Sequence, residues 1–232
     1  MRSILTFPVV LIACYVAQTA AMRAEACVPD QGGVPVCGEG KGAMRVFADT
    51  ISPSKQYAFA WRSPDGLPSG DATPSDDVDN ILIRLSDGAA VAKLGGRYWA
   101  TGVMRANRYD LVAAWSPDSK AVIELANSRW DSDVFTYYLL DADAVAKLDL
   151  LALVKPALKA KLPAKDRSNY AFRVAEEKPV ALDVGGHLGF TATLYRPKSD
   201  EASFDYKVRV GIISKKGRPT ARIVSVQRVK SD

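Results

Sequence analysis

The residues that could carry out acid–base or nucleophilic chemistry are few, and His187 comes first because it is the only histidine in the chain. It lies between glycines in the segment DVGGHLGF, residues 183–190. A Ser-His-Asp or Cys-His arrangement would have to use it, but the sequence contains no G-x-S-x-G elbow, phosphate-binding glycine loop or zinc-ligand spacing. We therefore expect His187 to be a turn residue, and we predict no catalytic residue, no metal ligand and no cofactor.

Carboxylates offer two further kinds of chemistry. Asp76, Asp77, Asp79 and Asn80 lie close together and could supply oxygen ligands to Ca²⁺, which takes about 6–8 of them, but the EF-hand spacing is absent. We expect a solvated loop. A pair of carboxylates that hydrolyses glycosidic bonds stays open, because such a pair is recognised by the distance between its members.

Aromatic side chains suggest binding. Trp61 and Trp115 each stand beside a Ser-Pro pair, and we expect both to pack between sheets. Trp130 lies in the polar segment NSRWDSD, residues 127–133. We predict it as the binding residue, because exposed tryptophans stack on sugars or serve as hot spots for proteins. Packing at a sheet edge is the alternative.

The N-terminus predicts export. Arg2 precedes an apolar stretch and small residues, so residues 1–26 are typical of a signal peptide, and cleavage sites fit after Ala21 and after Ala26. Alternatively, LIAC at residues 11–14 is similar to a lipobox, which would anchor the chain through a lipid on Cys14. In either case Cys27 and Cys37 remain, and an even pair in an exported chain predicts a disulfide.

Two segments have the same order of features. DNILIRLSDGAAVAKL (79–94) and FTYYLLDADAVAKL (135–148) both run from an apolar strand through a turn to AVAKL. Each follows a Ser-Pro corner and an alternating strand, SPSKQYAFAW (52–61) and SPDSKAVIEL (116–125). The first unit is longer by a Pro/Gly/Asp-rich stretch, residues 63–77, that predicts a surface loop. We expect Phe59 and Ile123 to be buried, Tyr57 and Phe59 to face the same side as Val122, and Glu124 to face outward.

A third unit is indicated further along. Residues 188–197 alternate as a strand, and residues 203–226 give strand, Lys-Lys-Gly turn and strand at period 2. Each unit would then hold about four antiparallel strands in ~50 residues, the size of a propeller blade.

WSPDSKAVIEL followed by FTYYLLDAD resembles the TolB-type and WD-type propeller repeat, although position 119 is Ser where that pattern has Gly. The resemblance implies a mainly β fold of two to three four-stranded propeller-like units, arranged as an incomplete propeller or a β-sandwich. We predict one β-rich domain over residues 27–232, with units at about 44–95, 108–148 and 170–228.

One segment breaks the β pattern. The apolar spacing of residues 149–162 predicts a linker helix, with Asp149 as its N-cap and Pro156 either kinking it or starting a second helix.

The last 37 residues are basic. Residues 196–232 hold ten Lys and Arg against four Asp and Glu, a balance of +6 in a chain of net charge +5. We interpret these cations as the solvated faces of strands. A peripheral contact with anionic membrane lipid is the alternative, and we expect no nucleic-acid partner.

Together these features predict a periplasmic or secreted repeat protein that binds a protein or a cell-envelope component without catalysis. The alternatives are a carboxylate-dependent hydrolase of envelope polymers and a structural envelope lipoprotein.

Overall fold

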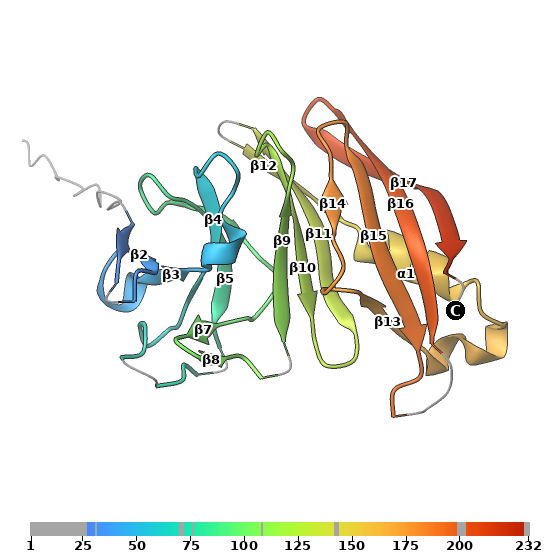
Figure 1. The fold of residues 1–232 in the computed structure, drawn as a ribbon. Coiled ribbons are helices and arrows are strands. Elements are labelled where there is room, and N and C mark those ends of the chain that lie inside the picture. Colours follow the sequence, from blue (N-terminus) through green and yellow to red (C-terminus); the bar gives the residue numbers. More distant parts are fainter. Residues whose placement is uncertain are drawn as a thin grey trace, which may run out of the picture.

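The computed structural model describes residues 27–30, 32–69, 72–75, 77–107, 109–141, 144–198 and 203–229. The predicted signal peptide, Cys14 and Asp76 lie outside these ranges. Nearly half of the described residues lie in strands, and three antiparallel sheets stand side by side in chain order (Figure 1). Within the described part of the chain the stack is open, with no closed ring of sheets.

The N-terminal sheet has six strands in sequence order, rather than the four we predicted. They are β1 (Val28–Pro29), β2 (Pro35–Cys37), β3 (Met44–Val46), β4 (Tyr57–Arg62), β5 (Asp79–Arg84) and β6 (Ala90–Lys93). The two extra strands are the short arms of the segment closed by the disulfide between Cys27 and Cys37. This disulfide confirms the predicted pairing.

The central sheet has four strands: β9 (Asp110–Trp115), β10 (Ala121–Asn127), β11 (Ser132–Asp141) and β12 (Ala144–Asp149). A small hairpin of β7 (Ala100–Thr101) and β8 (Met104–Arg105) precedes it. Every residue of β10 is buried, because this strand lies inside a sheet that is covered on both faces.

The C-terminal sheet has five strands: β13 (Ala171–Val174), β14 (Ala181–Leu182), β15 (His187–Tyr195), β16 (Phe204–Lys215) and β17 (Arg218–Arg228). The turn between β16 and β17 contains Lys216 and Gly217, both with positive φ (52° and 73°). Two such residues match the right-handed twist of a tight hairpin, so the predicted Lys-Lys-Gly turn is where the chain reverses.

Two apolar layers hold the stack together. Phe59, Trp61 and Leu82 of the N-terminal sheet pack against Val122 and Tyr138 of the central sheet. On the other face of the central sheet, a larger cluster joins it to the C-terminal sheet. Its members include Ile123, Leu125, Phe135, Phe172, Phe190 and Val208.

The two Ser-Pro corners have the same hydrogen bonds. The Ser52 hydroxyl accepts the Tyr57 N–H at 3.1 Å, and the Ser116 hydroxyl accepts the Ala121 N–H at 2.9 Å. The third residue after each serine has positive φ, 58° at Lys55 and 59° at Ser119. Since each serine satisfies the first N–H of the strand that follows, the corner fixes where β4 and β10 begin.

These corners correct the predicted register. They align Phe59 with Ile123, not with Val122, and both are fully buried, as we predicted for each of them. Glu124 does not face outward but is fully buried, because its side of β10 faces the N-terminal sheet.

The shared AVAKL segments are also out of register. Lys93 lies opposite Ile81, near a bulge at Val91 of β6, whereas Lys147 lies opposite Tyr138. Structurally, Leu94 corresponds to Leu150, since their N–H groups bond to Asn80 and Phe135 at 2.9 Å. A shift of two residues keeps each side chain on its face, because strands alternate with period 2. The identical letters therefore reflect similar hairpins rather than equivalent positions.

Helix α1 (Leu151–Lys159) is shorter than the predicted 149–162 and runs through Pro156 without a second helix. The Asp149 carboxylate accepts the Ala152 N–H at 3.0 Å, which is the expected capping contact one residue before the N-cap. Val154 and Leu158 are buried in the cluster between the central and C-terminal sheets. Three short 3₁₀ turns complete the described elements: Gly40–Gly42, Ala48–Thr50 and Ala164–Asn169.

Candidate functional site

A cleft of about 720 Å³ lies at the end of the stack away from the Ser-Pro corners. One wall is the loop after β6 and the β7–β8 hairpin, and the other is the turn between β10 and β11 (Figure 1). Its volume falls in the range of about 300–1,000 Å³ that small-ligand sites occupy. We call it the arginine cleft, after the three arginines that line it: Arg97, Arg105 and Arg129.

The arginine cleft is cationic. No carboxylate belongs to its described lining, and none of the three guanidinium groups forms an ion pair with a carboxylate in the part of the chain that the structure describes. All three residues are exposed. Guanidinium groups bind carboxylate, sulfate and phosphate through paired hydrogen bonds, so these three side chains are of the kind that could bind an anion.

Aromatic side chains share the cleft with these cations. Trp99, Tyr109 and Trp130 all line it. Trp130 is half-buried, and the Arg129 guanidinium lies 4.5 Å from the centre of its ring. The structure therefore places the predicted binding residue in the arginine cleft, with a cation beside it.

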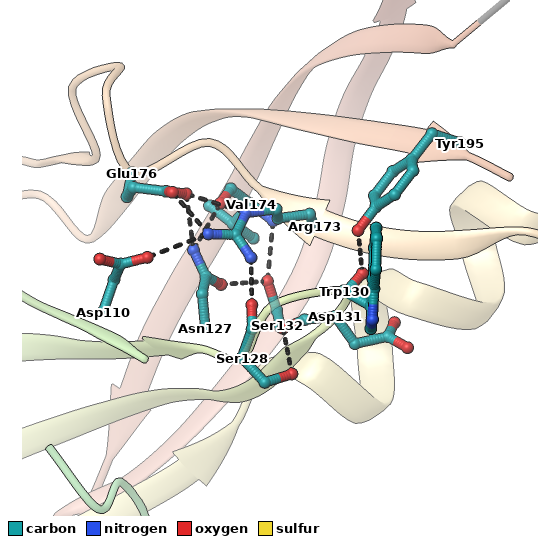
Figure 2. A network of polar contacts seen from close by, with 10 residues as sticks. All are labelled: Asp110, Asn127, Ser128, Trp130, Asp131, Ser132, Arg173, Val174, Glu176 and Tyr195. Atoms are coloured by element: carbon teal, nitrogen blue, oxygen red, sulfur yellow. Dashed lines mark hydrogen bonds and ion pairs between the residues drawn. The ribbon is translucent and has the colours of Figure 1, made fainter. Parts of the chain in front are cut away.

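A polar network anchors the turn that carries Trp130 to the C-terminal sheet (Figure 2). The Ser132 hydroxyl donates to Asn127 Oδ1 at 2.6 Å and accepts the Val174 N–H at 2.8 Å. Asn127 Nδ2 in turn donates to the Val174 carbonyl and to Glu176, at 3.0 and 2.8 Å. These groups are buried, so their mutual satisfaction holds the turn in one conformation.

Arg173 ties the same turn to its surroundings. Its guanidinium donates to the Ser128 carbonyl and forms ion pairs with Asp110 at 3.1 Å and Glu176 at 2.5 Å (Figure 2). Burial alone would raise the pKa of Glu176, but the hydrogen bond from Arg173 brings that pKa below its usual value. Glu176 is therefore the anionic partner that neutralises Arg173.

Contacts of Asp131 and Trp130 also hold the far side of the turn between β10 and β11. Asp131 Oδ1 accepts the Phe172 N–H at 3.0 Å and the Lys155 ammonium at 2.9 Å. The Tyr195 hydroxyl donates to the Trp130 carbonyl. The Trp130 main chain is thus fixed from β13, β15 and α1.

A second network supports the opposite wall. The buried Glu124 carboxylate accepts the N–H groups of Gly95 and Gly96 at 2.9 and 2.8 Å, and the Tyr138 hydroxyl at 2.8 Å. Asn80 accepts the Tyr98 N–H at 2.7 Å and donates to the Tyr98 carbonyl at 2.6 Å. Side chains from β10 and β5 therefore position residues 95–98, which lead into Trp99.

Burial shifts the pKa values of both Glu124 and Tyr138. Desolvation raises the pKa of Glu124 despite its three hydrogen-bond donors. Desolvation, together with the neighbouring Glu124 charge, also raises the pKa of Tyr138 far above its ordinary value. Since Glu124 has no exposed surface, its carboxylate supports the loop and does not reach the cleft.

The other candidate residues do not join this site. His187 begins β15 with its side chain 74% exposed and its Nδ1 3.0 Å from Asp183. Asp79 forms ion pairs with Arg62 and Lys93 at 3.1 and 2.6 Å, and the bond with Lys93 helps lower its pKa. Asn80 is buried, and its side chain forms hydrogen bonds with the Tyr98 main chain. Among the described residues, no group of three or more His, Cys, Asp or Glu is arranged to hold a metal ion.

The sequence singled out Trp130 but not the three arginines that line the cleft with it. They come from separate segments, and nothing in their spacing indicates that they meet. Each belongs to an exposed polar stretch that resembles any solvated loop. The adjacent pair Arg129-Trp130 was the one local signal available.

No helix in the described portion is long and apolar enough to cross a membrane. Comparison of the chain with protein-family models, with curated proteins and with solved structures found no match.

Proposed function

We propose that this protein is an exported, propeller-like repeat protein that binds an anionic component of the cell envelope in the arginine cleft, without catalysis. The observation that carries the proposal is the meeting of three guanidinium groups, none with a carboxylate partner among the described residues, with Trp130 on a turn held by buried hydrogen bonds. Such a surface favours an anion with a flat face, as an acidic sugar has, because the charge binds arginine and the ring stacks on tryptophan.

The repeat part of the proposal has its own support. The two Ser-Pro corners have the same bonds, and the strands of the N-terminal and central sheets follow one another in chain order. Sheets stacked face to face through apolar layers are the arrangement of successive propeller blades. Export is supported by the disulfide between Cys27 and Cys37, which is compatible with an oxidising, extracytoplasmic location.

Binding is favoured over carboxylate-dependent hydrolysis by the position of the acids. A hydrolase would bring two carboxylates to the ligand, at least one of them with a shifted pKa. The carboxylate here with the pKa raised by burial, Glu124, is enclosed between two sheets. The described lining of the cleft holds none.

Calorimetric titration of the mature protein with an oligomer of an acidic sugar tests the proposal. The neutral oligomer of the same length is the control ligand. We expect binding of the acidic oligomer alone, with affinity lost in Arg97→Gln/Arg129→Gln and reduced in Trp130→Ala. Equal binding of both oligomers, or an unchanged affinity in the arginine variant, would contradict it. Release of reducing ends during the titration would instead favour hydrolysis.

A further inference from the structure

The outward face of the β16–β17 hairpin is strongly cationic. Residues 203–229 contain seven Lys and Arg and a single acid, Asp205, so this hairpin carries about the whole positive charge of the chain. Six of its cations are exposed on the outer face or at the turn of the hairpin: Lys207, Arg209, Lys215, Lys216, Arg218 and Arg222. We call this surface the basic face.

Nothing described neutralises these charges. Asp205 already accepts the Thr193 hydroxyl at 2.6 Å and forms an ion pair with Lys178 at 3.4 Å. None of the six cations forms an ion pair with a carboxylate in the described ranges. The inward side chains of the same strands, such as Val208 and Val210, are buried, so alternation directs the cations away from the core.

Two aliphatic side chains stand exposed among the cations. Ile213 shares the outward parity of Arg209 and is 59% exposed. Val224 is the extra residue at the bulge of β17, is 57% exposed and lies over Gly211, whose missing side chain leaves it room. Exposed aliphatic side chains have no role on a strand face that only contacts water. A surface that enters a lipid headgroup layer, by contrast, combines cations with projecting aliphatic groups.

The shape of the face also indicates the partner. The hairpin strands hold 12 and 11 residues, a length of roughly 35 Å at the usual rise per residue. Charges distributed along such a ribbon match a plane of many phosphates better than one enclosed ligand. The C-terminal sheet also ends the stack, so a plane can approach it (Figure 1).

We propose that the basic face docks the protein on the surface of an anionic phospholipid bilayer, with Ile213 and Val224 entering the headgroup layer. This site is separate from the arginine cleft and does not depend on what the cleft binds. Each cation near an anionic membrane adds to the attraction, and salt weakens it.

Co-sedimentation of the mature protein with vesicles tests the proposal. We expect binding to phosphatidylcholine vesicles that contain phosphatidylglycerol, none to pure phosphatidylcholine, and release by salt. Lys207→Glu/Arg209→Glu/Arg222→Glu should lower the partition coefficient by about two orders of magnitude. The matched control, Arg97→Glu/Arg105→Glu/Arg129→Glu, makes the same change of net charge in the cleft and should bind vesicles nearly as the parent does.

A second pair of substitutions separates lipid from a soluble polyanion. Ile213→Ser/Val224→Ser keeps the charge and, since both side chains are exposed, keeps the fold, which circular dichroism would verify. It should weaken vesicle binding while leaving binding to heparin unchanged. An equal loss in the cleft control, a vesicle affinity unaffected by Ile213→Ser/Val224→Ser, or binding to heparin but not to vesicles would each overturn the proposal.

Discussion

Glu124 shows how a single residue can be read wrongly from its neighbours in sequence. In AVIEL it occupies a position that a half-exposed strand would turn to solvent, yet the central sheet is covered on both faces. The carboxylate is retained in the interior because three donors surround it. A buried polar group that is fully satisfied specifies one arrangement of its partners, here the loop at residues 95–98.

The buried Glu124 carboxylate predicts an unusual pH dependence of the free energy of unfolding. The pKa of Glu124 is raised in the folded state above its ordinary value of 4.5, so between these two pKa values the folded protein binds the extra proton. The contribution of Glu124 to stability therefore falls as pH rises from about 4.5 through the raised pKa. We expect Glu124→Gln to remove this slope, with the amide oxygen still accepting the Gly95 and Gly96 N–H groups and the amide nitrogen donating to the Tyr138 hydroxyl in reversed direction, as urea unfolding across this pH range would measure.

The hydroxyl of Tyr138 also affects this pH dependence, because it donates a hydrogen bond to Glu124. Tyr138→Phe removes one donor to the buried carboxylate, which should cost about 1–3 kcal/mol in the free energy of unfolding. The loss should be larger at neutral than at acidic pH, because the ionised form needs the donor more. The same loss at both pH values would show that Glu124 does not ionise in the folded protein.

At the scale of elements, the turn between β10 and β11 is more ordered than its composition suggests. The segment NSRWDSD reads as a solvated loop, but Asn127, Ser132 and Asp131 bond to β13, which lies about 40 residues further along the chain. The turn is thus a joint between two sheets as well as one wall of the cleft.

Ser132→Ala tests this joint. It leaves the Val174 N–H and Asn127 Oδ1 without their partner in a buried place, so we expect a loss of about 1–3 kcal/mol in the free energy of unfolding. Ser214→Ala, at an exposed position of β16, is the control and should change stability by less than about 0.5 kcal/mol. Ligand affinity of the cleft should fall only in the first variant. Equal stability of the two variants would mean that the network contributes little.

The disulfide also acts on one element. Cys27 and Cys37 are separated by 10 residues and close the short strands at the edge of the N-terminal sheet. Replacing both with serine should cost roughly 2–3 kcal/mol, with faster hydrogen exchange confined to β1–β3. Peptide mapping without reductant checks the pairing itself, and free thiols at both positions after oxidising preparation would refute it.

For the whole molecule, the central sheet is the structural centre, because its residues take part in both apolar layers. The C-terminal sheet exposes one face, which carries its cations, whereas the face of the N-terminal sheet away from the central sheet belongs to a third buried apolar cluster that includes Val46, Ala58 and Ile81. Burial of both faces of one sheet makes the three sheets depend on one another for stability.

Substitutions at two isoleucines, one buried and one exposed, would test how much the apolar layers contribute to stability. Ile123→Ala removes a fully buried side chain from the central sheet and should cost about 2–5 kcal/mol, with Phe59→Ala of similar or larger cost. Ile213→Ala makes the same chemical change at a side chain that is 59% exposed and should cost less than about 0.5 kcal/mol. Thermal unfolding by calorimetry would compare them, and similar losses for both isoleucines would contradict the layered core.

The amino-acid sequence by itself determined the local structure of this protein. Period-2 alternation placed β15, β16 and β17, because a strand with one buried face must alternate. The serine hydroxyls at residues 52 and 116 define their turns through bonds to residues only five away in the chain. The disulfide also followed from the sequence, because Cys27 and Cys37 are the two cysteines that remain beyond the predicted signal peptide and they lie close together in the chain.

Only the tertiary structure decided what these elements meet. A sequence shows which face of β10 is apolar but not that a second sheet covers the opposite face, so the burial of Glu124 was not foreseeable. The offset of the AVAKL segments depends on how each hairpin pairs, including a bulge at Val91 of β6 that no residue type announces. Arg97, Arg105 and Arg129 join Trp130 because two sheets stack face to face with their turns side by side. Such sites arise from contacts between residues distant in sequence, and those contacts depend on the packing of the whole chain.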